Sequence, residues 1–265
     1  MRTLCLLGIL CGTTVAAEET YDCVMDPSAT VLVGSATSGL LDTVTVGRGD
    51  QVEKGQVIAA LSSTLELATF EVLNARASAT AAIDARKAQL ELVQSRYDRA
   101  QELKDSSVIT ADRLAELSAE LVASQSLLRQ AELERAIAVQ ERDRAQAALD
   151  QRQIRSPIDG IVVFRNQAGG QFLAQDDYVV ALVALDPLYV EAFLPIEIYS
   201  QVTLGTAGTV EPNAPIGGTY SAEVTVVDQV FDAASGTFGI RLSLPNPDGL
   251  LPAGQRCKLS FQDAK

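Results

Sequence analysis

Apolar and polar residues follow two different patterns along the chain. In the middle, apolar residues recur every three or four positions, the spacing of one helix face. Between Gln56 and Ser156 there is no glycine and no proline, the residues that interrupt helices most strongly. Long helices are therefore predicted here, whereas the flanking stretches are typical of short strands. The two helical runs are Ile83, Leu90, Val93, Tyr97 and Ala100, and then Leu114, Leu117, Leu121 and Leu128.

The helical region contains a break in the sequence "KDSSVITADRL". Ser106 and Ser107 favour a turn, and Thr110 is a good N-cap with an acidic residue two positions later. We therefore expect two antiparallel helices, Leu65–Lys104 and Ala111–Gln153. Each would be about 60 Å long at a rise of about 1.5 Å per residue.

The seam between these helices is imperfect, because Arg86 and Arg135 fall near core positions. Small alanine contacts would suit a pair of helices that also packs sideways against other helices. A solvated two-helix coiled coil fits the pattern nearly as well, and the sequence leaves both interpretations open.

The stretches that flank the helices resemble each other. When the chain is shifted by 121 positions, the difference between Gly39 and Gly160, glycines and apolar residues coincide without a gap. Gly55 falls on Asp176, which also tolerates left-handed turn geometry. Each half alone has too little apolar surface to be stable. We therefore expect both halves to fold together about a pseudo-twofold axis. Further matched pairs are Leu40 and Ile161, Leu41 and Val162, Gly49 and Gly170, Val52 and Leu173, Ile58 and Val179, and Leu61 and Leu182.

The remainder, about residues 186–262, is rich in strand and turn signals. Five or so strands are predicted, in "PLYVEAFL", "TAGTVEP", "TYSAEVTVVDQV", "TFGIRLSL" and "QRCKLSF". The stretch "PIEIYSQV", which opens with Pro195, predicts a short helix after the first strand. This set of elements favours a small closed β-barrel.

Composition excludes several classes of function. The chain has 21 basic and 34 acidic residues and a net charge of −13, which argues against nucleic acid or anionic lipid as a partner. It contains no histidine, so no Ser-His-Asp, Cys-His or histidine–metal site can exist. We expect no catalytic residues and no metal site.

Residues 1–17 have the pattern of a signal peptide, with one arginine, a short apolar run and small residues at its end. The run is too short to predict a membrane span, and Ile9 and Leu10 before Cys11 disfavour a lipoprotein. We expect an exported chain in the periplasm; whether the segment is cleaved or kept as an anchor stays open.

Export leaves two cysteines in the mature chain, Cys23 and Cys257. An oxidising compartment favours their pairing. The bridge would close a very long loop, which the chain-entropy model values at roughly 5 kcal/mol. Two buried free thiols are the alternative.

The sequences "GDQVEKGQVIAAL" and "SPIDGIVV" carry a family resemblance. Together they resemble the split lipoyl/biotinyl-like motif of HlyD-like periplasmic adaptor proteins, also called membrane-fusion proteins, of tripartite efflux pumps. Two such halves around a glycine-free helical insertion make the match specific, and it covers essentially the whole mature chain. The matching residues are Gly49, Asp50, Val52, Gly55, Gln56 and Leu61 in the first half, and Pro157, Asp159 and Gly160 in the second.

The resemblance implies an elongated, multi-domain α+β protein. The strand around Tyr21–Asp26 would return to the barrel, where a Cys23–Cys257 bridge would fasten it to the last strand. The expected parts are a signal peptide at 1–17, a β-barrel from 18–30 and 186–262, a split lipoyl/biotinyl-like β-domain from 31–63 and 154–185, and a long antiparallel α-helical coiled-coil hairpin at 64–153.

A true lipoyl or biotinyl carrier is the competing interpretation. Carriers need a lysine at the tip of the β-turn, because its amine forms the amide bond to the cofactor. The equivalent position falls near Thr64 and Leu65, where there is no lysine. Lys54 lies inside the turn before Gly55, and we interpret it as a solvated charge. We therefore expect no cofactor and no enzymatic activity.

In the family, an Arg-x3-Leu-x6-Ser pattern at the hairpin tip is associated with docking to a TolC-like outer-membrane channel. This chain has Arg99, Leu103 and Thr110 at those spacings, with threonine in place of serine. The arginine would donate to a partner helix pair, the leucine would fill an apolar groove, and the threonine would hydrogen-bond while capping its own helix. The alternative is that Arg99 is an ordinary surface charge, Leu103 a seam residue and Thr110 only a helix cap.

The resemblance implies an adaptor between an inner-membrane transporter, of resistance-nodulation-division (RND) type first, and a TolC-like channel, for export of small molecules. Trimers or hexamers around the pump are expected. Many family members continue into a further domain, whereas this sequence ends just after the barrel. There are therefore two alternatives to an RND partner alone: an ABC-type exporter as partner, or a second and longer adaptor that works beside this one. A coiled-coil envelope scaffold without a transport role is less favoured. The transported substrate leaves no trace in the sequence.

Overall fold

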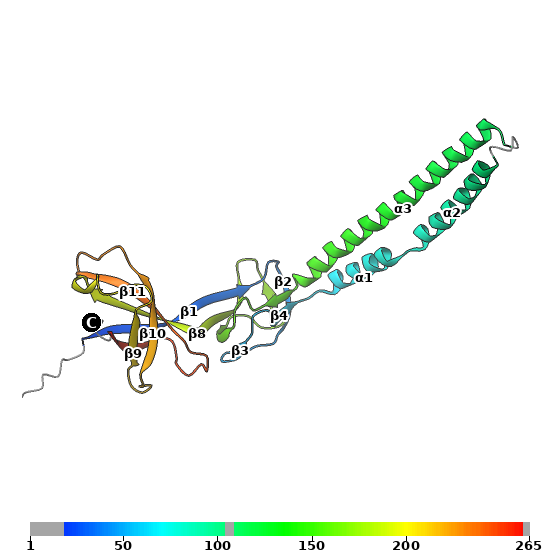
Figure 1. Ribbon diagram of the computed structural model, residues 1–265. Coiled ribbons are helices and arrows are strands. Elements are labelled where there is room, and N and C mark those ends of the chain that lie inside the picture. Colours follow the sequence, from blue (N-terminus) through cyan, green and yellow to red (C-terminus); the bar gives the residue numbers. More distant parts are fainter. Residues whose placement is uncertain (1–18, 104–108, 262–265) are drawn as a thin grey trace, which may run out of the picture.

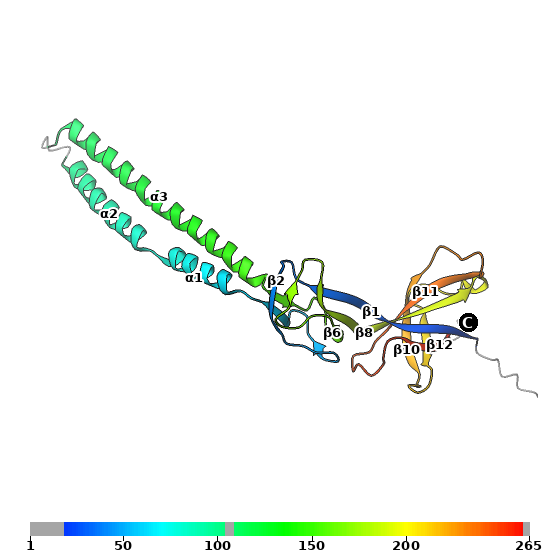
Figure 2. The same cartoon turned by 180° about the vertical axis from the view of Figure 1, so that it is seen from behind.

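Three bodies lie in a row along an elongated molecule (Figure 1). The computed structural model describes residues 19–103 and 109–261, and the predicted signal peptide lies outside these residues. A β-barrel occupies one end, a smaller β module the middle, and two helical arms the other end; Figure 2 shows the same order from behind. The chain therefore runs from the barrel out to the arms and back again.

The two helical arms together are called the rod, and the first arm is not one helix. The prediction of a single helix over Leu65–Lys104 is wrong, because one helix ends at Ser78 and another begins at Ala81. Between them Ala79 is extended, with φ −68° and ψ 121°. The second arm is one helix of 40 residues, close to the predicted Ala111–Gln153. The elements are α1 (Thr64–Ser78), α2 (Ala81–Glu102) and α3 (Ala111–Asp150).

The arms bury a narrow stripe of side chains where α1 and α2 pack along α3. On α3 the buried positions recur every seven residues without interruption, the spacing of heptad packing. Many of these residues are small, so the arms approach closely while burying little apolar area. The buried residues are Leu117, Ser124, Ala131, Ala138 and Ala145 on α3, and Ala77, Ile83, Val93 and Ala100 on the first arm.

The middle module confirms the internal repeat predicted from the sequence. Its first three strands recur 121 positions later, the difference between Gly39 and Gly160 that the sequence showed. The first set is β2 (Gly39–Val44), β3 (Gln51–Val52) and β4 (Val57–Leu61); the second is β6 (Gly160–Arg165), β7 (Phe172–Leu173) and the start of β8 (Tyr178–Pro195).

The two halves hold each other by reciprocal backbone pairing. β2 pairs with β7 and β3 pairs with β6, so each half completes a ladder in the other. The Gly49 N–H donates to Val162 O at 2.8 Å, and its repeat equivalent, the Gly170 N–H, donates to Leu41 O at 2.7 Å. Both glycines have positive φ, 93° and 86°, which glycine adopts without the steric cost of a side chain. The pseudo-twofold arrangement therefore extends to individual hydrogen bonds.

One core joins the two halves and sets the base of the rod. β4 pairs with β5 (Gln153–Arg155), so the arms leave and re-enter the module on neighbouring strands. This pairing brings the start of α1 close to the end of α3. The buried core residues are Val33, Leu41, Val46, Val52, Ile58, Ala59, Leu61, Ile154, Val162, Leu173, Val179, Val180 and Leu182.

Six strands close the predicted barrel in the order β1-β12-β9-β10-β11-β8, and β8 pairs back onto β1. The short helix predicted after Pro195 is a single 3-10 turn, Ile196–Ile198. β1 and β8 continue from the barrel into the middle module, so the boundaries expected near residues 30 and 185 fall within continuous strands. The remaining strands are β1 (Thr20–Gly34), β9 (Ala207–Pro212), β10 (Tyr220–Val227), β11 (Thr237–Leu244) and β12 (Gln255–Phe261).

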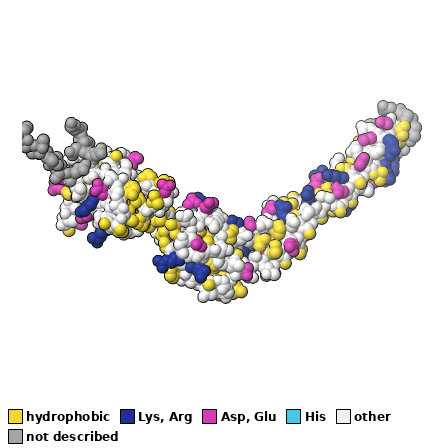
Figure 3. Space-filling view, turned by 90° about the horizontal axis from the view of Figure 1, so that it is seen from below, with side chains coloured by type: hydrophobic (Ala, Val, Ile, Leu, Met, Phe, Trp, Pro, Cys, Tyr) yellow, Lys and Arg dark blue, Asp and Glu magenta, His cyan; other side chains and the backbone are white. Residues whose placement is uncertain are grey.

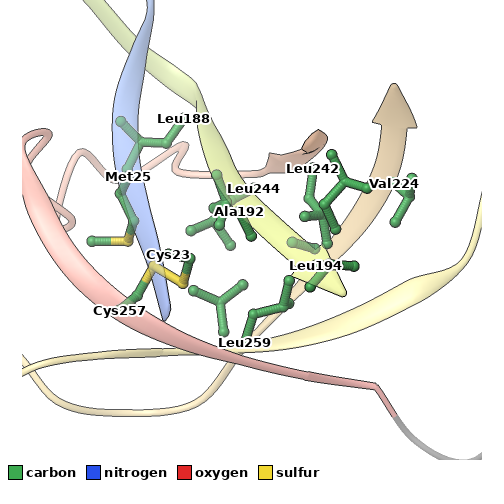
Figure 4. Close-up of a cluster of buried hydrophobic side chains, with 14 of the residues drawn as sticks. Cys23, Met25, Leu188, Ala192, Leu194, Val224, Leu242, Leu244, Cys257 and Leu259 are labelled. Atoms are coloured by element: carbon green, nitrogen blue, oxygen red, sulfur yellow. A yellow bond between two sulfur atoms is a disulfide. The ribbon is translucent and has the colours of Figure 1, made fainter. Parts of the chain in front are cut away.

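A disulfide joins the first and last strands of the barrel, as predicted. Cys23 on β1 and Cys257 on β12 are direct cross-strand partners and are bonded to each other. Both are buried in the barrel core, where Figure 4 shows them beside Met25 and Leu259. The bond links positions 234 residues apart, and it excludes the alternative of two free thiols.

Loss of this disulfide should lower the free energy of unfolding by up to about 5 kcal/mol, because a closed loop of this size restricts the unfolded chain. Thermal unfolding of the exported chain, with and without reductant, checks this beside the Cys23→Ala/Cys257→Ala double variant. Reductant should lower the Tm of the wild type and leave that of the double variant unchanged. Equal Tm values in all four samples would contradict the prediction.

Candidate functional site

Arg99, Leu103 and Thr110 all lie at the end of the rod farthest from the β domains (Figure 1). Arg99 is in the last turn of α2, Leu103 directly follows α2, and Thr110 directly precedes α3. All three residues are exposed. The connection between the arms, residues 104–108, lies outside the described residues. The fold thus brings the three predicted residues to one end of the molecule.

Thr110 is the N-cap of α3, as the sequence predicted. Its backbone is extended, and its Oγ1 accepts a hydrogen bond from the Arg113 N–H at 3.3 Å. This bond satisfies one of the four N–H groups that a helix leaves without an internal partner. A hydroxyl can also donate its proton, so capping leaves Thr110 able to donate to a second group.

An apolar groove of about 490 Å³ lies beside Thr110. Tyr97 from α2 and Leu114 from α3 are wall residues of this groove. Both residues were predicted to lie in the seam, and the groove was not predicted, because it depends on how far apart the two arms lie. The lining consists of Tyr97, Ile109, Thr110, Ala111, Leu114, Ala115 and Ser118.

Charges of both signs surround this end of the rod. Figure 3 shows Lys and Arg side chains gathered on one side near the tip, with acidic side chains close by. Arg113 pairs with Glu116 at 2.5 Å, and both side chains are more than half exposed. Exposed pairs of this kind contribute only about 0–1 kcal/mol, so this pair adds little to the stability of the tip.

Arg152, which was not among the predicted site residues, fixes the other end of the rod to the middle module. Its guanidinium donates to Glu66 Oε1 at 2.5 Å in the first turn of α1, and to Ser38 O at 3.2 Å before β2. The two charged side chains are only 23% and 18% exposed. One arginine therefore ties together the end of α3, the start of α1 and the β1–β2 connection. Nothing in the sequence distinguishes this pair from the other charges of the arms.

The position of a carrier lysine is occupied by the first residue of α1, Thr64. Lys54 is exposed in its turn, and its backbone N–H donates to Asp159 Oδ1 at 2.7 Å. Among the described residues, no three His, Cys, Asp or Glu side chains gather where they could hold a metal ion. Within 19–103 and 109–261, no helix combines the length and the hydropathy needed to cross a membrane.

Both β domains match known families. Residues 29–184 match the CzcB-like barrel-sandwich hybrid domain, and residues 187–265 match the CusB-like β-barrel domain. A barrel-sandwich module that is split by helical arms and followed by such a barrel defines the class of membrane-fusion proteins. The chain belongs to the periplasmic adaptor family of efflux pumps within this class, with a CzcB-like hybrid domain.

Individual relatives are distant. MacA from Actinobacillus actinomycetemcomitans has a similar fold, with a TM-score of 0.73 and 23% identity over 94% of this chain and 80% of that one. The cobalt-zinc-cadmium resistance protein CzcB of Cupriavidus metallidurans is 24% identical over 79% of this chain. An uncharacterized protein of Haemophilus influenzae is 21% identical over 84% of this chain. The chain spans only 38% of the first of these two curated relatives and 51% of the second.

Replacement of Thr110 by alanine should destabilise the start of α3 by about 1 kcal/mol, because the cap is lost. Serine keeps the acceptor and should be nearly neutral. Hydrogen exchange of the Arg113 and Leu114 amides, which bond to the Thr110 side chain and carbonyl, measures the difference directly. Equal exchange rates in the alanine and serine variants would show that the cap contributes nothing.

Replacement of Arg152 by methionine should destabilise the base of the rod by about 1–3 kcal/mol, because a shielded carboxylate loses its charged partner. Urea unfolding, together with hydrogen exchange in the first turn of α1, measures the effect. Arg144→Met is the control, since Arg144 is an exposed arginine on the same helix. A second change, Glu66→Gln, should recover part of the loss. If the Arg152 and Arg144 variants lose equal stability, the Arg152–Glu66 pair does not stabilise the base of the rod.

Proposed function

We propose that this protein is a periplasmic adaptor that links an inner-membrane RND transporter to a TolC-like outer-membrane channel, for export of small molecules. It acts as a structural linker without enzymatic chemistry. The observation that carries the proposal is the rod, which interrupts a single β module and holds an exposed set of docking-type residues at its far end.

The dimensions of the rod support this role. An α-helix of 40 residues is about 60 Å long at a rise of about 1.5 Å per residue. Arms of this length reach well beyond the β domains, which lie together at the other end (Figure 2). In the proposed complex, the arms form a coiled-coil hairpin directed toward the outer membrane, and the barrel contacts the transporter.

At the tip, Arg99, Leu103 and Thr110 are the proposed contacts. The planar guanidinium of Arg99 can donate to carbonyl or carboxylate oxygens of a partner helix pair. Leu103 is 45% exposed and supplies an apolar contact, while the hydroxyl of Thr110 supplies a hydrogen bond. Tyr97 and Leu114, which line the groove beside Thr110, would contact the channel together with these three residues.

An RND transporter is the first choice of partner, because the barrel matches a CusB-like family whose model is named for RND systems. An ABC-type exporter, or a second adaptor, would use the same rod. Several copies around the pump, as a trimer or hexamer, are part of the proposal. Val122, Leu133 and Ile137 are 56%, 61% and 51% exposed. Their spacing places them on one face of α3, away from the seam, where neighbouring copies could pack.

Replacement of Leu103 by glutamate should abolish docking, because a charge would enter an apolar contact at the centre of the tip. Leu92→Glu is the matched control, since Leu92 lies on α2, which Leu103 directly follows, and is 46% exposed against 45% for Leu103. A photo-reactive residue at Gln101 in native cells would report the contact, with the crosslinked outer-membrane protein identified by mass spectrometry.

The wild type and the Leu92 variant should both give a crosslink to a TolC-like channel, and the Leu103 variant should lose about nine-tenths or more of it, as for a hot-spot residue. An undiminished crosslink in the Leu103 variant would remove the docking assignment. If the wild type crosslinks to another class of protein, a TolC-like channel is not the partner of the tip.

A further inference from the structure

The first arm of the rod is interrupted at Ala79 and Thr80, although no glycine or proline lies there. The facing helix, α3, is continuous past this point, and its buried residues keep their seven-residue spacing throughout. The interruption is therefore a property of the first arm alone, and the positions of its seam residues explain it.

The seam residues of the first arm change phase between α1 and α2. In α1 the inward positions are Glu66, Phe70, Leu73 and Ala77, in steps of four, three and four. The next buried residue is Ile83, six positions after Ala77 rather than seven. In an unbroken helix Ile83 would point about 120° away from Ala77 around the axis. The chain must leave the helix for both residues to face α3.

One extended residue also restores the length of the arm. Five helical residues and one extended residue rise about 10.8 Å, against about 10.5 Å for seven helical residues. The extended conformation of Ala79 therefore keeps α2 level with the uninterrupted heptads of α3. A heptad that is one residue short is accommodated without displacement of either end.

Arg135 of α3 bonds across the interruption. Its Nε donates to the carbonyl oxygen of Ala77 at 3.2 Å. This oxygen is at the end of α1, where the helix itself supplies no N–H donor. Arg135 follows Ala131 and precedes Ala138, which are both buried and small and leave room for the side chain. The arginine that looked like a defect of the seam thus lies where the facing helix is broken.

The other side of the interruption is weakly held. Thr80 precedes α2 but makes no side-chain cap hydrogen bond, so the first turn of α2 lacks a contribution of about 1 kcal/mol that a cap normally supplies. Arg76 and Glu141 form a second cross-arm contact nearby, at 3.4 Å, but their side chains are 70% and 44% exposed. Arg135 is itself exposed, but its bond to the fixed backbone carbonyl of Ala77 is partly buried, so it is the more specific connection at this level of the rod.

We propose that Ala79 and Thr80 form a joint at which α2 changes its angle relative to α1, and that Arg135 is the positioning residue that holds this joint closed. The joint would let the tip adjust its direction while the base stays fixed. This use of the joint rests on the proposed adaptor function, but its existence does not.

Hydrogen exchange of the exported chain, followed by mass spectrometry, tests the joint without any partner or transport assay. In the wild type, the Asp84–Lys87 amides, the first in α2 that can bond within the helix, should exchange about tenfold or more faster than those of Ala131–Ala138 on α3, because the joint opens locally. One alanine inserted after Ala79 restores the spacing of seven. It should slow exchange at the joint about tenfold, as a continuous helix forms.

An alanine inserted after Ala85 is the matched control. It lengthens α2 by the same amount but disrupts a regular part of the seam, so exchange should become faster along α2. If the two insertions have the same effect, or if the wild-type joint is as protected as α3, there is no joint and the proposal is overturned.

Arg135 is tested separately. Arg135→Met should speed exchange at the joint about threefold to tenfold by loss of a charged hydrogen bond, Arg135→Lys should recover part of the protection, and Arg144→Met should leave the joint unchanged. A uniform change along the whole rod would indicate a general structural role. That result, or no change in Arg135→Met, would overturn the assignment of Arg135.

Discussion

The architecture depends on reciprocal pairing between two halves of one small β module. Neither half completes its own ladders: β2 needs β7, and β3 needs β6. The hydrogen bonds from Gly49 and Gly170 show how strictly the two halves correspond. Because the partners are separated by the entire rod in sequence, the module forms only when both ends of the insertion return to the same place. The pairing therefore fixes the base of the rod, and the two ends of the rod can separate only if the module unfolds.

The rod is held differently from the β domains. Its two ends meet on neighbouring strands, β4 and β5, and Arg152 adds a shielded ionic contact there. Above the base, the arms share only a thin seam of mostly small residues. The result is a stiff attachment that carries a lightly packed projection, with the proposed docking residues exposed at its far end.

Patterns that depend on local physics were predicted well. The repeat offset gave the strand starts of both halves, because each half must satisfy the same turns and ladders. The cysteines indicated the disulfide from compartment and number alone, and Thr110 indicated the start of α3. The break at Ala79 was not predicted, because the six-residue step from Ala77 to Ile83 involves neither glycine nor proline, and one alanine among many does not identify a seam position.

Features that depend on distant contacts could not be predicted. Glu66 and Arg152 lie 86 residues apart among many similar charges, and only the fold shows that they meet. The groove at the tip depends on how far apart the two arms lie, which the heptad pattern does not specify. The continuity of β1 and β8 through two domains was also hidden, because an alternating strand pattern does not reveal which neighbours it will have.

Those two strands have a mechanical consequence. β1 and β8 run antiparallel to each other from the barrel into the middle module, along the connection between these domains in Figure 1. Tension between barrel and rod would be carried along the two covalent backbones together, while the hydrogen bonds between the strands keep the pair in register. Such an arrangement resists separation far better than a hinge loop, so strain imposed at one end of the molecule would reach the other before the connection yields.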